Sequence, residues 1–99
     1  MFDRDFFLGF IKIHILHHAS QAEVYGVWLV EELRRHGYSL SYGTLYPTLH
    51  RLEREGFLQS RVQEVDGRRR KYYGITPKGA EALEEARARI RELIDEVLD

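Results

Sequence analysis

The stretch that decides the fold is residues 43–73, GTLYPTLHRLEREGFLQSRVQEVDGRRRKYY. Three leucines near its start have the i, i+4, i+7 spacing that gathers apolar side chains on one helix face. They are Leu45, Leu49 and Leu52. Further on, Asp66-Gly67 is a strong signal for a two-residue hairpin turn, and four consecutive cations, Arg68–Lys71, follow it. The sequence therefore predicts an amphipathic helix followed by a β-hairpin with a basic tip.

The helix in this stretch is expected to begin near residues 41–44 and to end at Gly56. Pro47 is unusual inside a helix, because its ring meets the carbonyl four residues back. Two alternatives remain open. Either Thr44 is the N-cap and Pro47 lies in the first turn, or the helix begins earlier and is bent.

The hairpin is expected to consist of strands at residues 57–65 and about residues 69–75. Alternation along the first strand places Leu58 and Val62 on one side. In the second strand we expect Tyr73 to belong to the core.

Two helices are predicted upstream. An apolar stretch at residues 5–16 favours a buried helix over a strand because of its length. Ser20 and Glu23 have capping-box spacing, which predicts the start of a second helix that runs to about residue 35. Gly26 lies on the buried face of that helix and suggests close approach by a neighbouring helix. His36-Gly37 would end it, with Gly37 in the left-handed conformation.

One more helix is predicted after the hairpin, because Thr76-Pro77 combines an N-cap residue with a proline at the first helical position. Apolar residues in this helix recur at intervals of 3, 4, 3 and 4, which is a heptad seam. They are Leu83, Ala86, Ile90, Leu93 and Val97. The elements together predict a mainly α fold with a small β-hairpin. We expect a winged helix-turn-helix domain at residues 1–76 and a C-terminal dimerisation helix at residues 77–99, whose seam packs against a second copy.

The charge is unevenly distributed along the chain. Although the formal net charge is -1, residues 1–79 carry 12 Lys/Arg against 9 Asp/Glu, and residues 80–99 carry 3 against 7. Local fields dominate because charges are screened over a Debye length of about 8 Å. The basic hairpin and the acidic tail are therefore expected to face different partners.

Several classes of protein are disfavoured by composition. The absence of cysteine excludes disulfides, thiol nucleophiles and thiolate metal sites. No apolar run approaches the roughly 20 residues that a membrane helix needs, and the start, Met-Phe-Asp-Arg-Asp, does not resemble an export signal. We expect a cytoplasmic protein without a membrane partner.

The predicted hairpin tip and the outer face of the helix before it carry the groups that DNA binding requires. Outward-facing candidates on the helix are His50, Arg51 and Arg54, and arginine is the commonest reader of guanine. Hydroxyls and backbone N–H groups at the helix N-terminus favour phosphate. The residues there are Ser41, Tyr42, Thr44 and Tyr46. In the hairpin, Arg68, Arg69, Arg70 and Lys71 would grip the backbone or probe the minor groove, with about two of the four in contact because strand residues alternate between faces.

Six short motifs follow one another along the chain. They are Tyr25-Gly26, Gly43-Thr44-Leu45-Tyr46-Pro47, Arg51-Leu52-Glu53, Gly56-Phe57-Leu58, Gly67-Arg68-Arg69-Arg70-Lys71-Tyr72-Tyr73 and Ile75-Thr76-Pro77-Lys78-Gly79. Over roughly residues 7–98 their order and spacing resemble the PadR family of bacterial transcriptional regulators, in its short subfamily with a single helix after the wing. The resemblance implies a homodimeric repressor that dimerises through its first and last helices. It also implies binding to an inverted repeat in double-stranded DNA and, often, a response to a small-molecule effector.

Two further features are not explained by DNA binding. His14 and His18 stand at i, i+4 and His17 lies between them, a pattern that invites a metal site. Because no third ligand with obvious geometry is nearby, we expect a polar or partly buried role at an interface, with no metal and no cofactor. Metal or haem sensing is the alternative. Trp28 projects away from the buried face of its helix, and we expect it to cover the first helix of its own or a partner subunit, or to line an effector pocket.

Alternatives to these assignments remain. Arg51 and Arg54 could merely pair with neighbouring glutamates on a solvated helix face. A winged-helix module for protein interaction, without specific DNA recognition, is the alternative function, and the intact cluster of wing cations argues against it. An enzyme is disfavoured, because paired carboxylates such as Glu84-Glu85 lie on an exposed helix without a cleft.

Overall fold

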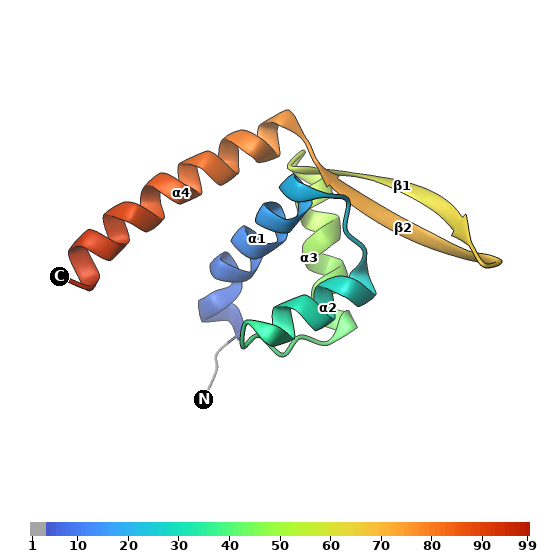
Figure 1. The fold of residues 1–99 in the computed structure, drawn as a ribbon, viewed down its shortest axis with the longest axis horizontal. Helices are drawn as coiled ribbons and strands as arrows, with labels where there is room; N and C mark the ends of the chain where they lie inside the picture. The colour runs from blue at the N-terminus through green and yellow to red at the C-terminus, as the bar shows by residue number, and fades with distance from the viewer. Residues whose placement is uncertain (1–3) are drawn as a thin grey trace.

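The computed structural model describes residues 4–99, and the expectation about export rests partly on residues 1–3, which lie outside the described part. The described elements are α1 (Arg4–Gln21), α2 (Gly26–Arg35), α3 (Tyr42–Arg54), β1 (Leu58–Val65), β2 (Arg68–Ile75) and α4 (Pro77–Val97). Three helices pack together, and the hairpin and α4 extend from this body in opposite directions (Figure 1). The extents are 52 × 33 × 20 Å. The prediction of a mainly α, winged helix-turn-helix fold is confirmed.

The first helix is longer than its capping signal suggested. α1 runs to Gln21, and the Ser20 hydroxyl donates to the carbonyl of His17 at 2.6 Å instead of capping α2. α2 begins later, at Gly26, after the N-cap Tyr25. The capping-box prediction is therefore wrong, because Glu23 is engaged elsewhere: both of its carboxylate oxygens accept hydrogen bonds from Arg61 of β1. No described helix combines the length and hydropathy needed to cross a bilayer.

Two glycines end α2 and α3 in the same way. Gly37 has φ +91° and Gly56 has φ +88°, a left-handed conformation that other residues rarely adopt. After α2, the N–H of Tyr38 donates to the carbonyl of Leu33 at 2.9 Å, and after α3 the N–H of Phe57 donates to that of Leu52 at 2.9 Å. These are the six-to-one bonds of Schellman motifs, and the expected ends of both helices are confirmed.

The start of α3 shows whether Pro47 lies in the first turn of the helix or further inside it. Ser41 is the N-cap and Tyr42 the first helical residue, so Pro47 lies inside the helix. The helix therefore begins earlier than it would with Thr44 as N-cap. The buried stripe is as predicted, because Leu45, Leu49 and Leu52 are at most 2% exposed.

The hairpin is antiparallel, with a register that runs from Leu58 opposite Ile75 to Val65 opposite Arg68. Asp66 (φ 51°) and Gly67 (φ 75°) connect the strands, and two successive positive φ values define a type I′ turn.

Only the inner half of the hairpin belongs to the core. Tyr73 is fully buried and Leu58 is 2% exposed, but Val62 is 49% exposed. Val62 is exposed although alternation places it on the same side of the strand as Leu58, because the hairpin extends past the helices that cover its base (Figure 1). The connection from α1 to α2 also pairs with β2: Val24 and Tyr73 exchange backbone hydrogen bonds of 2.9 and 2.8 Å.

α4 starts where the sequence predicts. The hydroxyl of Thr76 accepts a hydrogen bond from the N–H of Gly79 at 3.0 Å, and Pro77 occupies the first turn. Leu83 is 3% exposed and belongs to the hydrophobic core of its own chain. Its assignment to an intermolecular seam is therefore corrected, because the first turns of α4 still lie over the body of the protein. The seam available to a partner begins at Ala86.

Candidate nucleic-acid interface

The exposed side of α3 carries two rows of residues. The first is aromatic: the rings of Tyr42 and Tyr46 are stacked with centroids 5.9 Å apart, and those of Tyr46 and His50 are 6.4 Å apart. Tyr42 and Tyr46 are 45% and 38% exposed. Tyr46 also has a structural role, since a Cβ at Gly26 would come within 2.5 Å of its hydroxyl oxygen. The close helix approach predicted from Gly26 is thus made by the Tyr46 ring.

The second row contains the candidate base-reading arginines. Nε of Arg51 lies 3.8 Å from a carboxylate oxygen of Glu55, and the two side chains are 59% and 45% exposed. Such an exposed i, i+4 pair is weak, about 0.3–0.5 kcal/mol, so a phosphate or base can displace it. Arg54 is exposed and forms no ion pair with any residue from 4 to 99. The alternative that these arginines merely pair with neighbouring glutamates therefore holds in part for Arg51, which pairs weakly with Glu55. It does not hold for Arg54.

The N-terminus of α3 presents polar groups to solvent. Ser41 is the N-cap, but its side chain accepts no hydrogen bond from the helix backbone. Its hydroxyl lies 3.3 Å from the hydroxyl of Thr44. Both hydroxyls and the positive end of the helix dipole are therefore placed where a phosphate could contact them.

The four cations of the hairpin are held differently. The guanidinium of Arg70 stacks 4.2 Å above the Tyr25 ring, and Nζ of Lys71 lies 3.7 Å from a carboxylate oxygen of Glu53. These two side chains connect the wing to the body. Arg68 and Arg69, beside the turn, are exposed, and neither forms an ion pair within the described chain. Arg70 and Lys71 thus anchor the wing, whereas Arg68 and Arg69 remain exposed.

A groove connects the wing with α2 and α3. Its volume is about 500 Å³, and its walls include Tyr46 of α3, Gly26 of α2 and the hairpin residues Arg68–Lys71. Tyr46 of α3 and the basic wing therefore face a common hollow. Arg51 lines a second hollow of about 310 Å³, between α3 and α1, together with Thr44, Pro47 and others.

The apolar seam of α4 is open to solvent beyond its first turns. Leu93 is 45% exposed and Val97 65% exposed, whereas Ala86 and Ile90 are half-buried. Between α1 and α4 lies an apolar hollow of about 270 Å³, lined in part by Phe10 and Ile90. An exposed apolar surface of this kind on a small protein is typical of an interaction site.

The histidines form a cluster that includes a residue absent from the sequence-based argument. One ring nitrogen from each of His14, His18 and His36 lies within 4.8 Å of the others. The statement that no third ligand is nearby is therefore wrong, because the end of α2 brings His36 against α1. No local sequence signal could have shown this, because the approach of His36 to α1 depends on how α1 and α2 cross.

Trp28 lies beside this cluster, with its ring edge-on to His18 at a centroid distance of 5.3 Å. It thus contacts the first helix of its own chain, which is one of the two roles considered for it. It also lines a hollow of about 490 Å³ with Tyr25, Glu32 and others.

The fold and this surface define a winged helix-turn-helix protein. Within that class, the model of the family described as "Transcriptional regulator PadR-like family" matches residues 15–85. The chain is 55% identical over 95 residues to the transcriptional regulator Rv3488 of Mycobacterium tuberculosis, covering 96% of this chain and 89% of that protein. The chain therefore belongs to the PadR-like family of transcriptional regulators.

Solved structures agree with this assignment. A PadR family transcriptional regulator from Eggerthella lenta is similar with a TM-score of 0.83 and 33% identity, over 94% of this chain and 82% of that one. A PadR-like transcriptional regulator from Bacillus cereus gives a TM-score of 0.79 and 34% identity, over 96% and 97% of the two chains. These relatives are named as regulators and not as enzymes.

Proposed function

We propose that this PadR-like regulator is a cytoplasmic homodimeric repressor that binds an inverted repeat in double-stranded DNA. The observation that carries the proposal is the groove in which Tyr46 of α3 and the basic wing residues Arg68–Lys71 face one another. An α-helix in the major groove with a basic arm beside it is a recurrent way to bind a duplex. Arg51, Arg54 and His50 would meet base edges, and Arg68 and Arg69 would meet phosphates.

Dimerisation would use the seam of α4 from Ala86 to Val97 together with α1. Two recognition helices about 34 Å apart can read half-sites one helical turn apart. A dimer also doubles the number of phosphate contacts, which explains how a chain of net charge -1 could bind DNA. The C-terminal residues 77–99 would thus act mainly as the dimerisation helix, apart from the first turns, which complete the core.

A small-molecule effector would most readily bind in the hollow beside Trp28. That hollow lies next to α2, the first helix of the helix-turn-helix. A ligand there could change how α2 and α3 sit relative to α1. The alternative function, a protein-interaction module without specific DNA recognition, would need no exposed cations at the wing tip.

The test is fluorescence anisotropy with the DNA upstream of the protein's own gene and a scrambled duplex of equal length and composition. The titration is repeated at two salt concentrations. We expect tight binding to the upstream DNA alone, with two chains per site and a steep dependence on salt. A set of duplexes selected from random DNA covers the case in which the operator lies elsewhere, and failure to enrich any sequence would refute specific recognition.

A further inference from the structure

Three imidazoles from two helices converge at one point of the surface. His14 and His18 project from successive turns of α1, and His36 is the C-cap of α2. The His14 and His36 rings are stacked with centroids 4.9 Å apart. One nitrogen from each of the three rings lies within 4.8 Å of the others.

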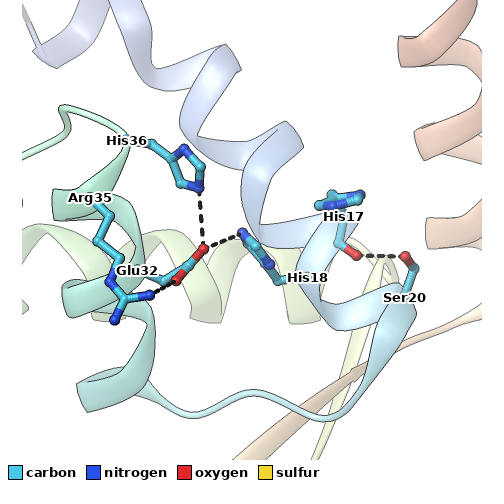
Figure 2. Close-up of polar contacts among 6 residues, drawn as sticks. All are labelled: His17, His18, Ser20, Glu32, Arg35 and His36. Carbon is cyan, nitrogen blue, oxygen red and sulfur yellow. Dashed lines mark hydrogen bonds and ion pairs between the residues drawn. The ribbon is translucent and has the colours of Figure 1, made fainter.

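A carboxylate completes the group. Oε2 of Glu32 lies 3.2 Å from Nε2 of His36 and 3.6 Å from Nε2 of His18 (Figure 2). The other oxygen, Oε1, lies 3.6 Å from Nη1 of Arg35, so the carboxylate is oriented by its second oxygen. Zinc ligands at about 2.0–2.1 Å in a tetrahedron are separated from one another by about 3.3 Å. Both Glu32–histidine distances are close to that edge length.

One nitrogen of the cluster has no hydrogen bond. Nε2 of His18 is buried and makes none with residues 4–99. A buried polar atom without a partner is costly, and it calls for an occupant of complementary chemistry. Since this nitrogen faces Glu32 and His36 (Figure 2), the missing partner would lie in the centre of the cluster.

Two of the three imidazoles, His14 and His18, are biased towards the form that binds metal. Burial lowers the pKa of His14, and the neighbouring His36, His18 and His17 lower it further. Burial also lowers the pKa of His18, against the opposing effect of Glu32. Neutral imidazole leaves a nitrogen lone pair available at neutral pH, as coordination requires.

We propose that His14, His18 and His36 bind one divalent transition-metal ion per chain, of the class of Zn²⁺, with Glu32 as the fourth ligand. Imidazole and carboxylate ligands suit Zn²⁺ and Co²⁺, and a chain without cysteine offers no thiolate for softer ions. The nitrogens lie within 4.8 Å of one another, and the rings of the exposed His36 and the half-buried His14 have room to rotate towards tetrahedral spacing.

A metal at this position would join α1 to the end of α2. The buried face of α2 includes Leu29 and Leu33, and Trp28 of α2 also contacts His18 of α1. The ion would therefore fix the helix-turn-helix relative to the helix that is proposed to form the dimer. The metal site itself does not depend on DNA binding, and it can be tested in the absence of DNA.

The experiment is a titration of chelator-treated, dialysed full-length protein with Co²⁺, followed by competition with Zn²⁺. Absorption of tetrahedral Co²⁺ in the visible range reports coordination, and the fluorescence of Trp28, the single tryptophan, reports events near His18. The variants are His36→Ala, at an exposed helix end where folding should not be affected, and Glu32→Gln. His17→Ala is the matched control, because His17 is a neighbouring histidine of α1 that is not among the three clustered rings.

We expect one Co²⁺ per chain in the wild type and displacement by Zn²⁺. His36→Ala should weaken binding by at least about 100-fold, beyond what loss of an outer-shell partner usually costs, while His17→Ala should not change it. Circular dichroism of each variant verifies folding. Equal affinity of wild type and His36→Ala, equal weakening by His17→Ala, or one ion per two chains would each overturn the proposal.

Discussion

Gly79, in the first turn of α4, is the position where a single methyl group should have the largest effect on stability. A Cβ added there would lie 2.1 Å from the carbonyl oxygen of Phe57 and 2.8 Å from Cγ1 of Ile75. Non-bonded heavy atoms are optimally about 3.5–4.0 Å apart. Because the nearest atom belongs to the backbone, Gly79→Ala can be accommodated only if the start of α4 moves away from Phe57.

Such a movement would disturb the contacts of Thr76. Its N–H donates to the carbonyl of Phe57 at 3.2 Å, and its hydroxyl donates to the carbonyl of Gly56 at 2.5 Å while capping Gly79. Overpacking typically costs about 1–3 kcal/mol, and a lost hydrogen bond or cap costs about 1 kcal/mol each. Alanine regains about 1 kcal/mol of helix propensity. The free energy of unfolding should therefore fall by about 2–4 kcal/mol in Gly79→Ala.

The measurement is urea unfolding followed by far-UV circular dichroism at one fixed protein concentration, because the stability of an oligomer depends on concentration. Gly9→Ala is the matched control, since a Cβ at Gly9 has no atom within 4 Å. There the helix propensity of alanine should raise stability by up to about 1 kcal/mol. If Gly79→Ala lost less than about 1 kcal/mol with an unchanged m-value, the close packing of α4 against Phe57 would be refuted.

Three other substitutions test separate parts of the structure. Arg68→Ala with Arg69→Ala removes up to four phosphate contacts per dimer, so the slope of log K against log salt should decrease by up to about 3.6; an unchanged slope in anisotropy titrations would contradict the wing assignment. Ile90→Glu with Leu93→Glu should give monomers in analytical ultracentrifugation, and a persistent dimer would exclude the α4 seam as the interface. Tyr73→Phe removes a buried hydroxyl without a hydrogen-bond partner in residues 4–99 and should raise the free energy of unfolding by about 1 kcal/mol. Burial raises the pKa of Tyr73, so the wild type should lose stability above pH 10 as the unfolded chain ionises first, and the Phe variant should lose less.

Local signals along the chain were sufficient for most of the fold. Gly37 and Gly56 predicted helix ends because their left-handed conformation is a local requirement, and Asp66-Gly67 predicted the type I′ turn for the same reason. The capping box predicted from Ser20 and Glu23 was wrong, because a capping side chain can instead form hydrogen bonds that depend on tertiary structure. Glu23, its expected capping partner, pairs with Arg61, 38 positions further along the chain.

The candidate sites were less predictable than the fold. Periodicity placed the exposed residues of α3 correctly, but it did not show that Tyr46 supports α2 at Gly26. His36 escaped notice because its distance from His14 is set by the crossing of α1 and α2, which no local pattern encodes. The difference between Arg68 and Arg70 likewise depends on a tyrosine, Tyr25, that belongs to another element.

The hairpin is held unequally along its length. Its inner rungs are fixed by the buried Tyr73, by backbone bonds to Val24 and by the pairing of Arg61 with Glu23. The two residue pairs nearest the turn, Glu64–Arg69 and Val65–Arg68, lie beyond the point where Arg70 stacks on Tyr25. Since the free energy of local opening follows tertiary contacts, amide protons of the inner rungs should exchange with solvent only when the whole domain unfolds, whereas those at the tip should exchange through local fraying. The wing is thus a rigid base with a compliant end, which could follow the contour of a curved polyanion while the sheet stays attached to the core.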